Sequence, residues 1–227
     1  MPTNDPDFGK AHRCKCKAEE DKADREQILY QHCNLPEATL NKTLGSFKTY
    51  GDPVLSEAWN LTKLIADGSS ELVFLTLIGH SDRGKSHLAI GACRQWLAKQ
   101  KSACYVNVPR ILNELRDGLD KEGEYSFRSR LSFYCRVGLL TLDDLGTEKI
   151  TAWGAEQLQT IINTRYDDML HTIVTTNRPL DDLFGYEDFK DSWRELANMR
   201  VASRLQRESW CQVVLLDTPA HSDRMGN

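Results

Sequence analysis

The sequence predicts an α/β fold, in which a central parallel sheet is covered by helices on both faces. Three observations support this fold class. Strand-like and helix-like stretches alternate from residue 53 onward, a glycine-containing loop follows the first strand-like stretch, and a later one ends in two aspartates. Parallel strands need a crossover segment between them, and helices usually supply it. We expect a small, mostly helical N-terminal segment to precede this domain.

The predicted strands are short apolar stretches. Residues 72–78 form a continuous run rich in β-branched and aromatic side chains, as a strand buried on both faces requires. The other predicted strands cover residues 103–108, 137–142, 172–176 and 212–216.

Helix-like stretches separate these strands. Residues 54–66 place apolar side chains at helical spacing, and Gly68 follows as a stop signal. Residues 109–119 begin with a proline, which suits the first turn of a helix. The remaining predicted helices cover residues 87–98, 155–166 and 193–206. We interpret residues 34–53, which contain prolines and glycines, as a connector.

Length and composition indicate one globular domain with a short appendage. The chain has 227 residues, 40% of them hydrophobic and 27% charged, and its net charge is −4. Without an overall positive charge, any DNA contact depends on a local patch or on partner subunits. The polar N-terminus lacks the apolar core of a signal peptide, and no apolar run is long enough to span a bilayer. We therefore expect a cytoplasmic protein without a membrane partner, with reduced cysteines in its core at Cys93, Cys104, Cys135 and Cys211.

Residues 79–86 match the phosphate-binding pattern G-x-x-x-x-G-K-[ST]. The glycines permit a tight turn whose backbone N–H groups point at phosphate oxygens, and the following helix adds the positive end of its dipole. Lys85 is expected to reach the β- and γ-phosphates, and Ser86 to offer its hydroxyl to Mg²⁺. A chance match is the alternative, and the strand–loop–helix context argues against it. We assign nucleotide binding to Gly79, His80, Ser81, Asp82, Arg83, Gly84, Lys85, Ser86 and His87.

Asp82 is an unusual residue at its position, where many such loops carry another glycine. An acid there lies close to phosphate charge, so we expect it to reduce nucleotide affinity. Aspartate tolerates a left-handed backbone better than most residues, so we still expect the loop to form.

Two acids follow the third predicted strand. Carboxylates at the carboxyl edge of a parallel sheet face the ligand crevice. Asp143 is expected to hold Mg²⁺, directly or through water, and Asp144 to orient or deprotonate the attacking water. A solvated turn before Gly146 is the alternative interpretation.

Asn177 and two arginines complete the candidate catalytic set. Asn177 follows a strand and is expected to position the water or sense the γ-phosphate, although a helix cap before Pro179 is an alternative. Arg200 and Arg204 lie four residues apart, on one face of a predicted helix. They are either an ordinary surface pair or an arginine finger for a neighbouring subunit, and spacing alone does not choose.

Together, these motifs resemble the AAA+ ATPases of the helicase-loader type (DnaC and DnaI), and they are similar to the related IstB-like ATPases. The resemblance spans about residues 43–217. It implies a P-loop NTPase (AAA+) three-layer sandwich. The matching blocks, in the family's order, are GHSDRGKSHLA, LLTLDDLGTEK, EQLQTIINTRY, TIVTTNRPLDDL and RVASRL.

The resemblance also implies residue roles. Lys85 and Ser86 belong to Walker A, and Asp143 and Asp144 to Walker B. Asn177 corresponds to sensor 1. The arginine finger corresponds to Arg204, with Arg200 beside it, and Arg224 is the best candidate for sensor 2, although its surroundings match the family poorly. The implied division is an N-terminal partner-binding segment, residues 1–42, and an ATPase domain, residues 43–227.

The N-terminal segment also resembles part of the family. Many relatives carry a small zinc-binding module ending in C-x-C, which Cys14 and Cys16 match, but the usual preceding C-x-x-C is absent. A degenerate remnant without zinc is the favoured interpretation. The residues available to hold zinc, if it binds, are His12, Cys14, Cys16, His32 and Cys33.

The resemblance implies ATP and Mg²⁺ as ligands and slow ATP hydrolysis stimulated by DNA or a partner. The implied role lies in DNA replication, where a homo-oligomer would load a replicative DNA helicase onto single-stranded DNA. Two alternatives stay open: an IstB-like transposition ATPase that recruits a transposase, and a nucleotide-binding adaptor with negligible turnover. The candidates for DNA contact are the basic cluster from Lys10 to Lys17 and the arginines Arg128, Arg130 and Arg136, with solvated surface charge the favoured interpretation of each.

Overall fold

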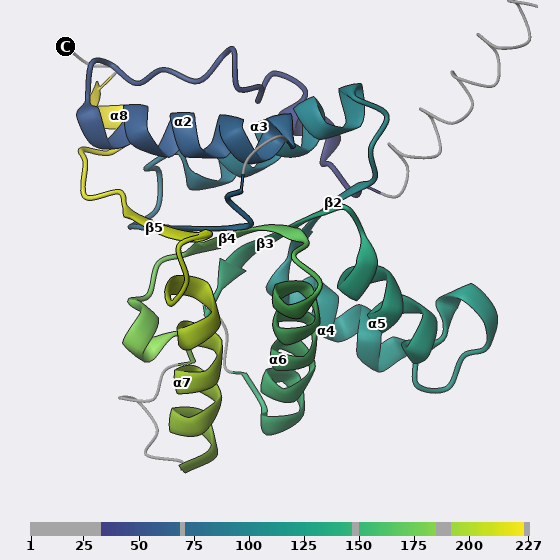
Figure 1. Cartoon of the computed structure of the whole chain (residues 1–227). Helices are drawn as coiled ribbons and strands as arrows, with labels where there is room; N and C mark the ends of the chain where they lie inside the picture. The colour runs from purple at the N-terminus through teal and green to yellow at the C-terminus, as the bar shows by residue number, and fades with distance from the viewer. Residues whose placement is uncertain (1–32, 69–70, 147–149, 185–191, 225–227) are drawn as a thin grey trace, which may run out of the picture.

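A five-stranded parallel sheet forms the centre of the computed structural model, which describes residues 33–68, 71–146, 150–184 and 192–224 (Figure 1). The strand order is β2-β3-β4-β1-β5, and every pairing is parallel. The five predicted strands are confirmed, with ends that differ by three residues or fewer. Their bounds are Phe74–Ile78 (β1), Ala103–Asn107 (β2), Leu139–Leu145 (β3), His171–Thr176 (β4) and Cys211–Leu215 (β5).

Helices cover both faces of this sheet (Figure 1). On one face lie α2 (Pro53–Asp67) and α3 (Lys85–Ala98). On the other face lie α4 (Val108–Asp117), α5 (Phe127–Arg136), α6 (Ala152–Asp167) and α7 (Ser192–Gln206). Successive strand residues point to opposite faces, so Phe74 packs in the cluster under α6 and Leu75 in the cluster under α3. The predicted three-layer α/β fold is confirmed.

The start of α2 illustrates how local sequence fixes these helices. Asp52 accepts hydrogen bonds from the backbone N–H groups of Val54 at 2.8 Å and Leu55 at 3.1 Å. Pro53 occupies the first turn, and Gly68, with φ of 61°, ends the helix in the left-handed region. These caps supply partners for backbone groups that a helix end leaves unpaired.

Helix α5 is an element that the sequence analysis does not predict. Its N-cap is Ser126, whose hydroxyl accepts the Ser129 N–H group at 3.3 Å. Only Tyr134 and Cys135 are buried within it, so its apolar stripe is narrow and the periodic signal is weak.

The three arginines of α5 were candidates for DNA contact. Arg128 and Arg136 are exposed, and Arg130 pairs with Glu114 at 3.5 Å. Arg128 and Arg136 are therefore placed as solvated surface charges are. Arg130 instead contributes an ion pair between α5 and α4.

Arg165, on α6, is a fully buried guanidinium that joins three elements. It donates hydrogen bonds to the carbonyl oxygens of Tyr134 at 3.1 Å, Val137 at 2.8 Å and His171 at 2.6 Å, and to Thr172 Oγ1 at 2.9 Å. Helix ends leave carbonyl groups unpaired, and Arg165 supplies donors for those at the end of α5. Burial lowers the pKa of Arg165 to about 9.

The described cysteines are free and buried, which confirms the prediction for the four core cysteines. Cys33 is also buried, in the cluster of α2 and α3, and its carbonyl oxygen accepts the Tyr105 N–H group at 2.8 Å. Within the described part of the chain, no group of three or more His, Cys, Asp or Glu side chains is arranged to hold a metal. The other residues available for zinc, which lie outside the described residues, are His12, Cys14, Cys16 and His32.

Most of the predicted N-terminal segment, residues 1–42, also lies outside the described residues. Its described end contains the short 3-10 helix η1 (Glu37–Thr39), and Leu35 packs against the same cluster as Leu44. The division after residue 42 stays a prediction. Across the described ranges, no helix combines the length and the apolar character needed to cross a membrane.

We predict that Arg165→Met lowers the free energy of unfolding by about 3 kcal/mol, because several buried carbonyl groups lose their donor. Urea denaturation followed by circular dichroism measures the change. Arg207→Met is the matched control, because it makes the same substitution at an exposed arginine. It should change the free energy of unfolding by about 0.5 kcal/mol or less. Equal stability of the two variants would contradict a structural role for Arg165.

Candidate nucleotide-binding site

The phosphate loop connects β1 to α3 through two residues in the left-handed region. Asp82 has φ of 61° and Gly84 has φ of 97°, which confirms that Asp82 adopts this backbone. A Cβ atom on Gly84 would lie 2.7 Å from the ring of Phe47, so a side chain has no room there. The loop leads directly into the first turn of α3, whose N–H groups form an anion-binding end.

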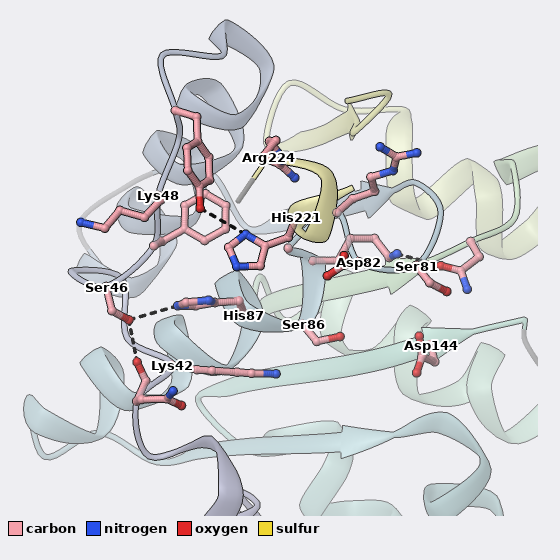
Figure 2. Close-up of a pocket in the computed structure, with 17 residues that line it drawn as sticks. Lys42, Ser46, Lys48, Ser81, Asp82, Ser86, His87, Asp144, His221 and Arg224 are labelled. Carbon is pink, nitrogen blue, oxygen red and sulfur yellow. Dashed lines mark hydrogen bonds between the residues drawn. The ribbon is translucent and has the colours of Figure 1, made fainter. Parts of the chain in front are cut away.

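A pocket of about 680 Å³ opens beside this loop (Figure 2). It collects most of the predicted nucleotide-binding residues, from Ser81 to His87, together with Asp144 and Asn177. Gly79 and His80 do not line it, but their carbonyl oxygens accept hydrogen bonds from Lys85. Its lining residues are Asn41, Lys42, Ser46, Phe47, Lys48, Tyr50, Ser81, Asp82, Arg83, Gly84, Lys85, Ser86, His87, Asp144, Asn177, His221 and Arg224.

Lys85 occupies the centre of a small hydrogen-bond network. Its ammonium group donates to the carbonyl oxygens of Gly79 at 2.6 Å and His80 at 2.8 Å, and to Asn177 Oδ1 at 2.7 Å. Burial lowers the pKa of Lys85, and the nearby carboxylates of Asp144 and Asp143 oppose that shift. The phosphate loop and the predicted sensor are thus in direct contact through this side chain.

Asp143 is buried and accepts hydrogen bonds from three elements. Ser86 on α3 donates to Oδ1 at 3.1 Å, Thr175 on β4 to Oδ1 at 2.6 Å, and Tyr105 on β2 to Oδ2 at 2.5 Å. Burial and the Asp143 charge raise the pKa of Tyr105, which keeps its hydroxyl protonated as a donor. The predicted magnesium residues Ser86 and Asp143 are therefore adjacent. No sequence motif identifies Tyr105 or Thr175 as partners of Asp143.

Asp144 adopts a left-handed backbone with φ of 58°, next to a shift in the register between β3 and β4. Its N–H group donates to Thr175 Oγ1 at 3.0 Å, and Asn107 Nδ2 lies 3.4 Å from its carboxylate. Irregularities of this kind re-aim a side chain at the end of a strand. Burial, followed by the charge of Asp143, raises the pKa of Asp144.

The donor set of the pocket fits a nucleotide phosphate and a divalent cation. Nε and Nη1 of Arg83 are buried and have no hydrogen-bond partner among the described residues. With Lys85 and the N-terminus of α3, they form a cationic end that suits phosphate oxygens. Ser86 and Asp143 offer the hydroxyl and carboxylate oxygens that Mg²⁺ prefers.

The second wall of the pocket comes from residues 41–50, which are part of the stretch interpreted as a connector. His87 on α3 attaches this stretch, because its Nε2 lies 2.9 Å from the carbonyl oxygen of Thr43 and 3.2 Å from Ser46 Oγ. Burial lowers the pKa of His87, which favours the neutral ring. The sequence signal for this wall was limited to aromatic residues, Phe47 and Tyr50, inside a turn-rich stretch.

The predicted arginines lie in different places. Arg224, on the short helix α8 (His221–Arg224), lines the pocket. Arg204 lies on α7, where its guanidinium stacks 4.6 Å from the ring of Tyr166 and Nε lies 3.4 Å from Asn163 Oδ1. Neither Arg204 nor the exposed Arg200 lines this pocket, so neither reaches the nucleotide site of its own chain.

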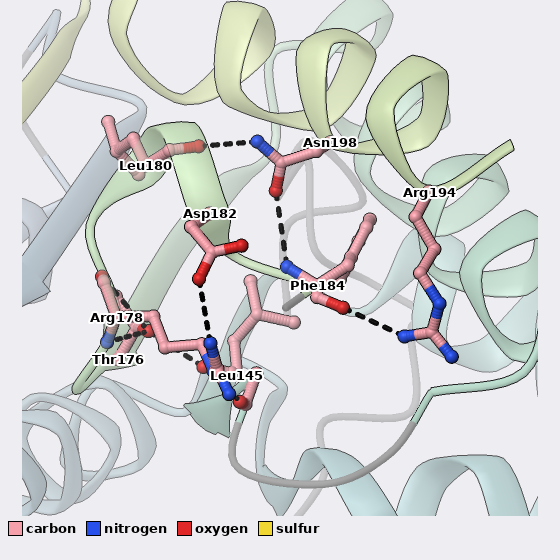
Figure 3. A network of polar contacts seen from close by, with 9 residues as sticks. Leu145, Thr176, Arg178, Leu180, Asp182, Phe184, Arg194 and Asn198 are labelled. Atoms are coloured by element: carbon pink, nitrogen blue, oxygen red, sulfur yellow. Dashed lines mark hydrogen bonds and ion pairs between the residues drawn. The ribbon is translucent and has the colours of Figure 1, made fainter. Parts of the chain in front are cut away.

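A polar network holds the ends of β3 and β4 together (Figure 3). Arg178, which follows the predicted sensor, donates to the carbonyl oxygen of Gly146 at 2.7 Å and pairs with Asp182 at 2.8 Å. Thr176 Oγ1 donates to the carbonyl oxygen of Leu145 at 2.7 Å. The turn after the acid pair and the segment after the sensor are therefore one connected unit.

The same network reaches α7 (Figure 3). Asn198 accepts the Phe184 N–H group at 3.2 Å and donates to the carbonyl oxygen of Leu180 at 2.9 Å. Arg194 donates to the carbonyl oxygen of Phe184 at 2.9 Å. The helix that carries Arg204 is thus anchored to the loop that leaves the nucleotide site.

Sequence comparisons connect the chain to a replicative helicase loader and to an ATP-binding protein of an insertion sequence. It is 26% identical over 110 residues to the replicative helicase loader DnaI of Bacillus subtilis, a match that covers 48% of this chain and 34% of that protein. It is 26% identical over 155 residues to the ATP-binding protein of insertion sequence IS5376 of Geobacillus stearothermophilus, covering 67% and 58% respectively. The chain therefore matches only about a third of the length of DnaI.

The fold is shared with solved AAA+ structures. A crystal structure of DnaI superposes with a TM-score of 0.65 at 20% identity, over 82% of this chain and 94% of that one. The family model of the IstB-like ATP-binding protein matches residues 66–197, which include the phosphate loop, the acid pair and Asn177. The chain accordingly belongs to the family of IstB-like ATP-binding proteins, P-loop AAA+ proteins related to the replicative helicase loaders.

Proposed function

We propose that this protein binds ATP with Mg²⁺ in the pocket beside the phosphate loop and hydrolyses it to ADP and phosphate. One observation supports this proposal above the others. Lys85 bonds to Asn177 and Ser86 bonds to Asp143, while Asp144 lines the same pocket, so three separate segments of the sequence meet at one edge of the sheet. This is the arrangement that phosphoryl transfer requires, since it depends on positioning and on charge stabilisation.

Each of these residues has a distinct proposed role. Lys85 binds the β- and γ-phosphate oxygens, exchanging its present acceptors for them. Ser86 and Asp143 hold Mg²⁺, which neutralises the charge that develops on the phosphate oxygens. Asp144 orients the attacking water and accepts its proton. Asn177 bonds to the water or to the γ-phosphate, because Lys85 already places its amide next to that position.

Arg204 completes the site of a neighbouring subunit in this proposal. It does not line the pocket of its own chain, as expected for an arginine that acts in trans. Stacking on Tyr166 holds its guanidinium in place at the surface of α6 and α7. Hydrolysis would then require a homo-oligomer.

We further propose that ATP binding by this protein serves the delivery of a replicative DNA helicase to single-stranded DNA. The sequence similarity to DnaI supports this role. Recruitment of a transposase is the second candidate, because the matching family model is the IstB-like one and the match to the insertion-sequence protein covers more of both chains.

We predict that two substitutions separate binding from hydrolysis. Lys85→Ala should weaken ATP binding by about 10-fold to 100-fold, because a charge-assisted contact to phosphate is lost. Asp144→Asn should leave the Kd for ATP nearly unchanged and lower kcat by about 100-fold or more. Calorimetric titration and phosphate release measure the two effects. Asp117→Asn, an exposed acid on α4 outside the pocket, is the control and should change neither. Unchanged turnover in both variants would rule out this site, and negligible turnover in the unmodified protein would favour the adaptor.

We predict that Arg204 acts on a neighbouring subunit. Arg204→Ala alone should lower ATP hydrolysis by about 1,000-fold, the contribution typical of an arginine finger. In a 1:1 mixture with Lys85→Ala, an interface is active when an Arg204→Ala subunit supplies the nucleotide site and a Lys85→Ala subunit supplies the arginine. Random assembly places them in this order at about a quarter of the interfaces, so about a quarter of the activity returns. Phosphate release from the mixed sample measures the recovery. A mixture that stays as inactive as its two components would exclude a role in trans.

We predict ATP-dependent binding to the replicative helicase of the source organism. The unmodified protein and Lys85→Ala are each passed over the immobilised helicase, with ATP or with ADP. Binding that needs ATP and an intact Lys85 supports the loader. If the helicase is not bound, and the cognate transposase is bound on duplex DNA instead, the second candidate replaces the first.

A further inference from the structure

Asp82 is the only acidic residue of the phosphate loop, yet its side chain engages the C-terminal part of the described chain. Its Oδ2 accepts the Ser222 N–H group at 2.9 Å, and its backbone carbonyl oxygen accepts the His221 N–H group at 2.8 Å. Figure 2 shows Asp82 and His221 side by side at the pocket. The phosphate loop and α8 are joined by these two hydrogen bonds.

Helix α8 in turn contacts the opposite wall of the pocket. His221 Nδ1 lies 3.4 Å from the hydroxyl of Tyr50, and their ring centroids are 6.0 Å apart. The Arg224 guanidinium lies 5.4 Å from the Tyr50 ring. His221 and Arg224 both line the pocket, so the segment that Asp82 holds contributes directly to its rim.

The charge of Asp82 is already engaged before a nucleotide arrives. The Ser222 N–H hydrogen bond lowers the pKa of Asp82, and the nearby His221 and Arg224 act in the same direction. The carboxylate is therefore ionised at neutral pH and bonded to α8. The same helix carries Arg224, a cation that lines the pocket.

We propose that Asp82 is a positioning residue for nucleotide binding, which holds α8 against the phosphate loop so that Arg224 and His221 remain at the rim of the pocket. This inference rests on the proposed ATP binding. It reverses the expectation that an acid in the loop reduces nucleotide affinity. Removing the carboxylate should weaken binding, whereas simple repulsion predicts that binding becomes tighter.

The test compares Asp82→Gly with Asp82→Asn. Glycine keeps the left-handed backbone and removes the acceptor, while asparagine keeps both that backbone and an oxygen acceptor. Titration with a fluorescent ATP analogue and Mg²⁺ should give a Kd about fivefold higher for Asp82→Gly, and within about twofold of the unmodified protein for Asp82→Asn. Asp223→Asn, which removes a neighbouring acid outside the pocket lining, is the charge-matched control and should leave Kd unchanged. Equal or tighter binding by Asp82→Gly overturns the proposal.

A double substitution tests whether Asp82 acts through α8. If it does, Asp82→Gly in an Arg224→Met background should change the Kd by less than about twofold, because the two residues act in one unit. A full fivefold effect in that background overturns the proposal.

Hydrogen exchange separates this inference from the proposed function. In the nucleotide-free protein, Asp82→Gly should speed exchange in a peptide covering residues 221–224 by about fivefold and leave α2 unchanged. Failure of the unmodified protein to bind ATP would reject the proposed function alone. If Asp82→Gly leaves the exchange rate of residues 221–224 unchanged, Asp82 does not hold α8 against the phosphate loop, whether or not the protein binds ATP.

Discussion

The architecture of the site depends on the hydrogen bonds that the buried carboxylate of Asp143 accepts. A charge at this depth requires several hydrogen-bond donors, and Ser86, Tyr105 and Thr175 supply them from three different elements. Those bonds tie the start of α3 and the strands β2 and β4 to the end of β3. The parallel sheet brings these elements to the same edge, and the carboxylate fixes their relative positions.

Local sequence patterns predict much of the fold and the residues at the centre of the site. They do not predict the second wall of the pocket. Lys85 and Ser86 lie where a loop after a buried strand must place them, and Asp143 follows from the end of another strand. Tyr50 lines the pocket only because tertiary contacts such as the one between His87 and Thr43 fold its segment back onto α3. Contacts of that kind have no period or spacing in the sequence.

Helix α5 and the contact of Asp82 with α8 are not predicted from the sequence, for related reasons. The buried stripe of α5 is narrow, and its stability depends on Arg165, a residue that lies on another helix. The backbone conformation of Asp82 is predicted correctly, but its hydrogen bond to Ser222 is not, because that partner is distant in sequence. In both cases one member of the hydrogen bond is a backbone group, which every residue carries, so the sequence does not reveal which side chain it pairs with.

The hydrogen bonds of Lys85 affect how freely the phosphate loop moves before it meets a nucleotide. The ammonium group closes the loop on itself through the carbonyl oxygens of Gly79 and His80, and Asn177 braces it from β4. A loop braced in this way has little conformational entropy left to lose when a ligand arrives. Under the proposed role, Lys85 acts on affinity in two ways. Its charge attracts phosphate, and until it exchanges these acceptors for phosphate oxygens its hydrogen bonds keep the empty loop close to the shape that a nucleotide needs.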